Sequence, residues 1–290
     1  MSNKDKSEFI LTLSCPDTHG IVAEVASFMT EQGLTIKESN QFGDTETDTF
    51  FMRVKALSIN SINKIDINKI RNLFKTIAIK RNMTFNIYNT REIPKIIIMV
   101  SKFDHCLMDL LYRVKTEELK VQIVGIISNH NEAANLAKNY NIPFHCIEVN
   151  KDNKSIAEKS LEKLIDKYDA EAIILARYMQ ILSKEISEKY SGKIINIHHS
   201  FLPSFKGASP YKQAYKRGVK LIGATAHFVT SDLDEGPIIE QDVARVTHAT
   251  SSSDMVAAGK DVERIVLFRA VKCYLERRVL LNKNKTIVFN

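Results

Sequence analysis

Apolar and polar positions follow two different periods over the first ninety residues. Residues 9–14 read as a strand, and the polar turn Cys15-Pro16-Asp17-Thr18-His19-Gly20 follows them. Apolar residues then recur at helical spacing from Ile21 to Met29, until Gly33 ends the helix. The remaining elements are a strand, a strand, a helix and a strand over 34–42, 49–56, 62–81 and 83–88. The order βαββαβ predicts a ferredoxin-like unit, a small sheet backed by both helices.

From Pro94 onward, unbroken apolar runs alternate with amphipathic stretches. Strands that helices cover on both faces are apolar throughout, so the pattern predicts an α/β fold with a doubly wound, mostly parallel sheet. The predicted strands are 95–100, 121–128, 144–149, 172–176 and 194–198, with a candidate edge strand at 286–289. The predicted helices are 107–115, 131–140, 155–167, 184–190 and 262–278. We therefore expect two domains, residues 1–90 and 91–290.

Composition narrows the class of protein. The 290 residues are 44% hydrophobic and 26% charged, close to globular averages, which excludes disordered and fibrous classes. Apolar runs fall far short of the ~18 residues that span a bilayer, and residues 1–20 lack a secretory signal, so we expect a cytoplasmic protein without membrane contact. Cys15, Cys106, Cys146 and Cys273 form no CxxC pair, which favours reduced, buried thiols and no structural metal.

The net charge of +7 comes from 41 basic and 34 acidic residues. Lysines recur along the whole chain with acids between them, so most are expected to be solvated, and a nucleic-acid partner is not expected. A weak basic cluster at 212–220 and the overall charge leave mild attraction of a small polyanion open.

Glycine and proline concentrate in one part of the chain. Between 203 and 237 lie Gly207, Gly218, Gly223, Gly236, Pro203, Pro210 and Pro237. This stretch follows the predicted strand that ends at His198. Ligands of open α/β sheets bind beyond the carboxyl ends of the strands, so the stretch is predicted to form a pocket wall.

Residues that could take part in catalysis lie just before and within the same stretch. Asn196 and His198 are two residues apart on a strand and project to one face, whereas His199 points to the other. The acidic turn 232–237, which contains Asp234, follows a strand predicted over 223–229. Amide and imidazolium donors can hold an oxyanion, and a carboxylate of raised pKa can take a proton from water or an amine. The alternatives are a capped strand end and an ordinary surface turn.

Three segments together resemble the folate-dependent formyltransferase fold family: 196–203 (NIHHSFLP), 224–229 (ATAHFV) and 232–237 (DLDEGP). Segments 175–183 and 104–107 are similar to the formyltetrahydrofolate deformylases within that family. The resemblance implies a catalytic triad in which Asn196 and His198 polarise the formyl oxygen and Asp234 transfers protons. It implies hydrolysis of 10-formyltetrahydrofolate to formate and tetrahydrofolate without a cofactor or metal, which supplies formate to purine synthesis and balances one-carbon folate pools.

The same resemblance extends to residues around the triad. It implies that the folate's pterin ring contacts Met179, Gln180, Ile181, Leu182 and Val229. For Met179, Ile181 and Leu182, ordinary core packing is the alternative. His199, His227 and Thr225 are expected to position the triad residues without touching the substrate.

The first unit is similar to the ACT family of amino-acid-sensing domains. The similarity rests on the βαββαβ order and on the turn Pro16-Asp17-x-x-Gly20. It implies that Asp17, His19 and Gly20 contact a regulatory amino acid, although His19 stands where many such domains have proline. Since such sheets pair between chains, we also expect a homo-oligomer.

The acceptor of the formyl group separates two hypotheses. Related transferases hold a phosphate in a Gly/Ser-rich loop after the first strand, where backbone N–H groups reach the anion. Here residues 101–106 (SKFDHC) contain no glycine and place Phe103 and Asp104 there, which favours water. Lys102 could still neutralise an anion, so a formyltransferase acting on a small amine such as glycinamide ribonucleotide is the alternative. A non-catalytic sensor is a third hypothesis, against which the intact triad argues.

Overall fold

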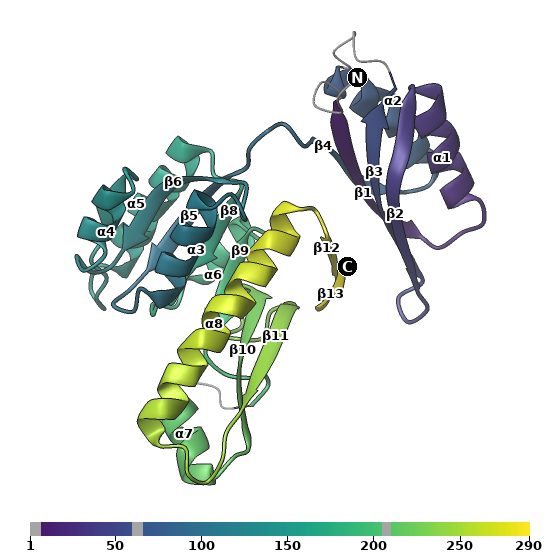
Figure 1. Ribbon diagram of the computed structural model, residues 1–290. Helices are drawn as coiled ribbons and strands as arrows, with labels where there is room; N and C mark the ends of the chain where they lie inside the picture. Colours follow the sequence, from purple (N-terminus) through teal and green to yellow (C-terminus); the bar gives the residue numbers. More distant parts are fainter. Residues whose placement is uncertain (1–6, 60–65, 205–209) are drawn as a thin grey trace. The chain divides into compact units, whose positions relative to one another are not determined.

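The computed structural model describes residues 7–59, 66–204 and 210–290. This part of the chain forms two compact units (Figure 1). The first runs to Ile93 and also contains Arg277–Leu280 and Ile287–Asn290; the second comprises Pro94–Glu276 and Leu281–Thr286. The predicted helix start at 62–65 and Gly207 of the predicted pocket wall lie outside the described residues.

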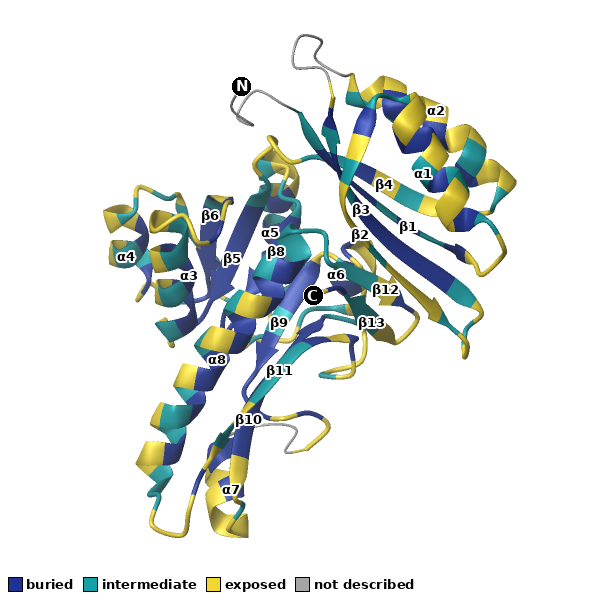
Figure 2. Cartoon of the chain, turned by 45° about the vertical axis from the view of Figure 1, so that its right-hand side comes forward, coloured by how far each residue is buried: buried dark blue, intermediate teal, exposed yellow. Residues whose placement is uncertain are grey.

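The first unit has the predicted order of elements. These are β1 (Glu8–Pro16), α1 (Ile21–Glu31), β2 (Leu34–Asp44), β3 (Thr49–Ser58), α2 (Ile67–Lys80) and β4 (Thr84–Asn89). The strands form an antiparallel sheet in the order β2-β3-β1-β4, with both helices against one face (Figure 2). Asp66 caps α2 by accepting a hydrogen bond from the Asn68 N–H at 2.9 Å. The ferredoxin-like prediction is confirmed.

The second unit contains the larger sheet. Its strands are β5 (Lys95–Val100), β6 (Gln122–Ser128), β7 (Phe144–Cys146), β8 (Ala172–Leu175), β9 (Ile194–His198), β10 (Leu221–Phe228) and β11 (Ile238–Arg245). Their order is β11-β10-β9-β8-β5-β6-β7, parallel from β9 to β7 and antiparallel at β10 and β11. The predicted doubly wound, mostly parallel sheet is confirmed.

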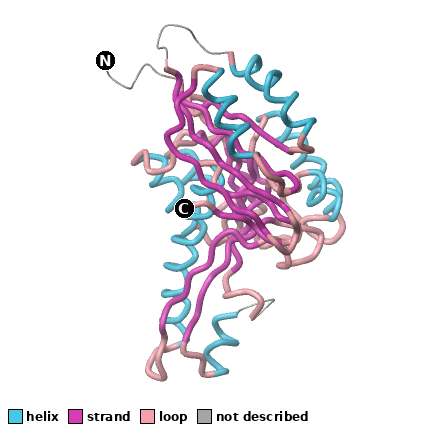
Figure 3. Tube along the Cα trace, turned by 90° about the vertical axis from the view of Figure 1, so that its right-hand side faces the viewer, coloured by secondary structure: helices cyan, strands magenta, loops and turns pink. Residues whose placement is uncertain are grey.

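Helices accompany this sheet along the chain. They are α3 (His105–Lys115), α4 (Ala134–Asn139), α5 (Lys154–Tyr168), α6 (Lys184–Lys189), α7 (Pro210–Arg217) and α8 (Ser252–Leu275). Strand β5 is buried along nearly its whole length, as its apolar run predicts (Figure 2). Helix α8 packs against β10 and β11 and runs beside them in Figure 3.

Several elements differ from the sequence-based expectations. Residues 286–289 do not extend the large sheet: β13 (Lys285–Val288) pairs with β12 (Val279–Asn282) in a separate hairpin. Cys146, expected to be buried, is exposed at the end of the short strand β7. Helix α8 begins at Ser252, ten residues before the expected start, because a capping box of Ser251 and Asp254 starts it.

The strand order creates a switch point between β5 and β8, which are neighbours in the sheet but lie far apart in the sequence. A ligand crevice is expected outside the carboxyl ends of strands at such a point. The residues that follow β5, β8 and β9 therefore define where a site can form. Among the residues described, no helix is both long enough and apolar enough to cross a membrane.

A core substitution tests the packing of the first unit. The Phe74 side chain is fully buried and makes edge-to-face contacts with Phe28 and Phe85, at centroid distances of 5.0 and 4.8 Å. Phe74→Ala should lower the free energy of unfolding by about 3–5 kcal/mol. Its neighbour Leu73 is 42% exposed, so Leu73→Ala should change stability far less. Urea denaturation of the full chain measures both; equal losses would contradict this account of the core.

Candidate functional site

The turn after β8 is fixed to the end of β5. The backbone N–H of Ser101 donates to the Arg177 carbonyl at 3.2 Å, and its side-chain oxygen accepts from the Met179 N–H at 2.9 Å. The Ser101 hydroxyl also donates to Asn129 Oδ1 at 2.6 Å. These bonds hold the segment beginning at Arg177 across the switch point of the sheet.

The register in which β9 pairs with β10 brings polar side chains together. His227 lies directly opposite Asn196 in this antiparallel pair. His198 Nδ1 lies 3.2 Å from Asp234 Oδ2, and His227 Nε2 lies 3.7 Å from Asp234 Oδ1. Asn196 Nδ2 is 3.2 Å from His227 Nε2. The predicted triad residues and His227 thus form one cluster.

Hydrogen-bond partners determine the tautomer of His227. Its Nδ1 lies 2.8 Å from the Phe228 carbonyl, which can only accept, so Nδ1 carries a proton. Its Nε2 faces both the Asn196 amide nitrogen, at 3.2 Å, and Asp234 Oδ1, at 3.7 Å. The contact with His227 fixes the orientation of the Asn196 amide.

The Asp234 carboxylate is held in its ionised form. Burial alone would raise its pKa, but hydrogen bonds and charges from His198 and His227 outweigh burial and lower the pKa below its usual value. The expectation of a raised pKa is therefore wrong, because two imidazoles face this side chain. Its backbone is left-handed, with φ of 57°. Gly236 allows the turn to return to β10, since a Cβ there would collide with the Phe228 carbonyl.

Thr225 fixes the loop that follows β9. Its hydroxyl donates to the Ser200 carbonyl at 2.9 Å and accepts from the Leu202 N–H at 3.0 Å. The amide of Gln241 also donates to this hydroxyl, at 2.9 Å. Thr225 therefore ties the loop to β10 and β11 without entering the triad.

The His199 ring lies near the rings of His198 and Tyr211, at centroid distances of 5.2 and 6.2 Å. Burial, followed by the positive charge of Arg177, lowers the pKa of His199 to about 3. The ring is therefore neutral at ordinary pH.

A cavity of about 260 Å³ joins the triad to the predicted folate contacts. Among its lining residues are Met179, Gln180, Ile181, Leu182, Val229, Asn196, His198 and Asp234. Met179 and Ile181 are 51% and 59% exposed, so core packing does not explain them, whereas Leu182 packs partly against the apolar core. The cavity thus combines an apolar rim with a polar end.

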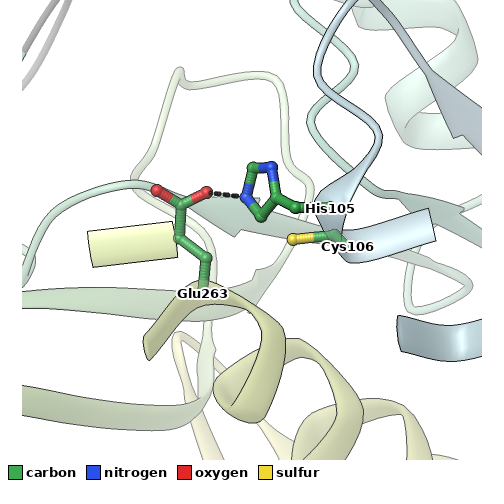
Figure 4. Close-up of side chains that lie close together, drawn as sticks. All are labelled: His105, Cys106 and Glu263. Carbon is green, nitrogen blue, oxygen red and sulfur yellow. Dashed lines mark hydrogen bonds and ion pairs between the residues drawn. The ribbon is translucent and has the colours of Figure 1, made fainter. Parts of the chain in front are cut away.

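Sequence reasoning missed a second buried cluster, shown in Figure 4. Glu263 on α8 points toward His105 and Cys106 at the start of α3. Its carboxylate accepts from His105 Nε2 and from the Tyr211 hydroxyl, each at 2.7 Å, and lies 3.5 Å from Arg177 Nε. From the sequence alone, a single glutamate within a predicted helix does not indicate which residues it will contact.

The atoms of His105, Cys106 and Glu263 lie within 4.8 Å of one another, a spacing that a metal ion could use. Burial, followed by the charge of Glu263, raises the pKa of the Cys106 thiol well above its usual value, so the thiol stays protonated. Both Glu263 oxygens are already hydrogen-bonded, and Arg177 balances part of their charge. These properties favour a hydrogen-bonded ion cluster over a cation site.

The predicted regulatory residues lie on the turn between β1 and α1. Arg81 Nη1 donates to the His19 carbonyl at 2.9 Å and to Thr18 Oγ1 at 3.1 Å. Gly20 precedes α1 with φ of 88°, a conformation that glycine favours. Asp17 donates its backbone N–H to the Asp48 carbonyl at 3.1 Å. The turn is thus rigidly held, and contact with an amino acid stays a prediction.

Comparison with known proteins agrees with this fold and site. Residues 94–271 match the family model for formyl transferases. The chain is 47% identical to formyltetrahydrofolate deformylase of Bacillus subtilis, over 99% of this chain and 95% of that protein. The crystal structure of formyltetrahydrofolate deformylase from Burkholderia mallei is similar with a TM-score of 0.93 and 47% identity, covering 98% and 100% of the two chains.

Phosphoribosylglycinamide formyltransferase from Anaplasma phagocytophilum is a more distant structural relative. It has a TM-score of 0.63 and 28% identity, and the similarity covers 69% of this chain and 96% of that one. The second unit is thus of the formyl transferase class. Because the deformylases match over nearly the whole chain, the chain belongs to the formyltetrahydrofolate deformylase family.

The lowered pKa of His199 predicts a pH dependence of stability. The folded ring has a pKa of about 3 against a reference value of 6.5, so below pH 6.5 the unfolded chain binds this proton more readily. The stabilisation is complete above pH 6.5 and is lost as the pH falls toward 3, by up to about 1.4 kcal/mol per pH unit.

Denaturation of the wild type and of His199→Asn at a series of pH values isolates this effect. The stability difference should be constant above pH 6.5 and shift progressively against the wild type below it. Parallel stability curves across the whole range would contradict a neutral, buried His199.

Proposed function

We propose that the chain hydrolyses 10-formyltetrahydrofolate to formate and tetrahydrofolate. The observation that carries the proposal is the convergence of Asn196, His198 and Asp234 on one cavity with an exposed apolar rim. The deformylase relatives, similar over nearly the whole chain, support the same reaction. The apolar rim suits a flat pterin ring, and the polar end suits the formyl group.

In this mechanism the Asn196 amide and the His198 ring hold the formyl oxygen while water attacks the formyl carbon. The carbon–N10 bond then breaks, N10 takes a proton, and formate leaves. Donors placed where negative charge develops stabilise the transition state more than the substrate. His198 Nε2 is buried with no hydrogen-bond partner among the described residues, as expected of a group that meets its partner in the substrate complex.

Asp234 orients His198 through Nδ1 and supports a positive charge on the ring. It also positions the attacking water and accepts its proton in the transition state. Since the lowered pKa keeps Asp234 ionised, its titration does not set an acidic limb in the pH–rate profile. If the pH–rate profile has an acidic limb, the titration of a group other than Asp234 produces it.

The choice of water as acceptor is tested without any added amine. Incubation with 10-formyltetrahydrofolate alone should release formate, measured enzymatically, and tetrahydrofolate, measured by absorbance. Adding glycinamide ribonucleotide should neither accelerate folate turnover nor yield a formylated product by mass spectrometry. Formylated product formed at a rate near that of hydrolysis would favour the transferase alternative instead.

Substitutions test the roles in the triad. Asn196→Ala should lower kcat by about 10²–10³ with little change in KM, because its amide acts mainly in the transition state. Asp234→Asn should lower kcat by roughly 10²–10⁴, while any acidic limb persists in the residual activity. Asn135→Ala, on an exposed position of α4, is the matched control and should retain full activity.

Circular dichroism establishes that each variant is folded before its rate is interpreted. A folded Asn196 or Asp234 variant that keeps more than about a tenth of wild-type kcat, a loss below about 1.4 kcal/mol, does not have the assigned role.

We also propose that residues 1–90 form a regulatory ACT-like domain that binds an amino-acid effector, and that residues 91–290 form the catalytic domain. The βαββαβ order and the turn held by Arg81 support the first assignment. A homo-oligomer, which the sequence resemblance implies, and a cytoplasmic location, which the short apolar runs favour, complete the proposal.

A further inference from the structure

Arg177 is a buried cation with unused hydrogen-bonding capacity. Its side chain is 9% exposed. Neither Nε nor Nη1 has a hydrogen-bond partner among the described residues, and both atoms are shielded from solvent. A buried, charged donor without a partner costs free energy, so its retention calls for an explanation such as a ligand.

Glu263 does not satisfy Arg177. The two strong hydrogen bonds of its carboxylate go to His105 and Tyr211, at 2.7 Å each. Arg177 Nε lies 3.5 Å away, an ion pair without a hydrogen bond. The carboxylate therefore holds Arg177 in place while its charge is shared, and Nη1 keeps its full donor capacity.

The local structure places Arg177 beside the active-site cavity. Arg177 follows β8 directly and lines the cavity together with Asn196 and His198. Its backbone is left-handed, with φ of 65°, which a non-glycine residue adopts at a cost. Strained backbone that the surrounding hydrogen bonds maintain is a feature of ligand-binding positions.

Among the described residues, Glu263 supplies the carboxylate within ion-pair distance of Arg177, and His105 and Tyr211 share that carboxylate. His199, whose pKa Arg177 helps to lower, is neutral. Asp234 is engaged by His198 and His227. The Phe103 ring, with its centroid 5.6 Å from the guanidinium carbon, brings no formal charge. An anion that reaches Nη1 is thus attracted in a medium where water screens little.

We propose that Arg177 forms a binding site for a small monocarboxylate, and that its ligand in the reaction is the formate product. The identity of the ligand rests on the proposed hydrolysis, whereas the anion site itself does not. A guanidinium binds carboxylates with strong, charge-assisted hydrogen bonds. Because Nη1 is shielded from solvent, an anion reaches it only when neighbouring side chains shift, which favours an anion as small as formate.

Titration of the folate-free, full-length chain with ¹³C-labelled formate, at ionic strength held constant with chloride, tests the site. Wild type should show saturable binding by NMR. Arg177→Met should weaken formate binding at least tenfold, about 1.4 kcal/mol, and Arg177→Lys less. Arg269→Met removes an exposed arginine of α8, which pairs with Asp242, and should leave binding unchanged.

Glu263→Gln separates ligand binding from a purely structural role of Arg177. Removing this carboxylate leaves the Arg177 charge unshared, so formate binding should become tighter. If Arg177 only stabilises the fold, Glu263→Gln weakens or leaves unchanged whatever formate binding exists, and that result overturns the proposal. Absence of saturable binding to wild type, or equal affinity in a folded Arg177→Met variant, overturns it as well.

Arg177→Met removes the cation beside the buried Glu263, and breaking a buried ion pair in this way is destabilising. The double variant Arg177→Met with Glu263→Gln removes both charges and keeps the test available; it should also lose formate binding. Formate release from 10-formyltetrahydrofolate is assayed separately. Hydrolysis without Arg177-dependent formate binding refutes the site alone, whereas such binding without hydrolysis refutes the proposed function alone.

Discussion

The contact of one carboxylate with two imidazoles organises the site. Asp234 lies 3.2 Å from His198 Nδ1 and 3.7 Å from His227 Nε2, and these contacts keep it ionised despite burial. The arrangement requires β9 and β10 to pair in one register, since a shift by one residue turns His227 to the face opposite His198. It also requires Gly236, which lets the acidic turn approach β10.

A second buried carboxylate, that of Glu263, also holds separate elements together. Glu263 joins the start of α3 through His105, α7 through Tyr211 and the turn after β8 through Arg177. Burial would raise its pKa, but the hydrogen bond from His105 and the charge of Arg177 lower it. Gly259, one turn earlier on α8, leaves room for the Tyr211 ring. Both carboxylates thus fix elements that lie far apart in the sequence.

Much of this architecture could be predicted from the sequence. The unbroken run of β5 and the periodicity of α1 carry their own local signal, and the two-residue spacing placed Asn196 and His198 on one face. The charge state of Asp234 could not be predicted, because it depends on the register that brings His227 near it. The edge strand β11 was missed because polar residues interrupt its apolar alternation.

The other features that the sequence did not predict also depend on contacts that the local apolar pattern does not contain. Helix α8 starts in a stretch of small and polar residues, where a capping interaction and not an apolar stripe determines the boundary. Residues 286–289 have the composition of a strand, but the nearby turn lets them pair with 279–282 instead of joining the large sheet. Glu263 meets its partners His105 and Tyr211 only through tertiary packing, so no local sequence pattern predicts these contacts.

The electrostatics of the cavity bear on the choice of acceptor. A primary amine is largely protonated at neutral pH and must lose that proton before it attacks a formyl carbon. The Arg177 charge, whose partner Glu263 is shared with His105 and Tyr211, disfavours a second cation close to Nη1. Water has no charge to lose, and the proposed anion site at the same guanidinium would receive the formate product. In the proposed mechanism the buried arginine thus adds to the missing glycine after β5 as a reason for water to be the nucleophile.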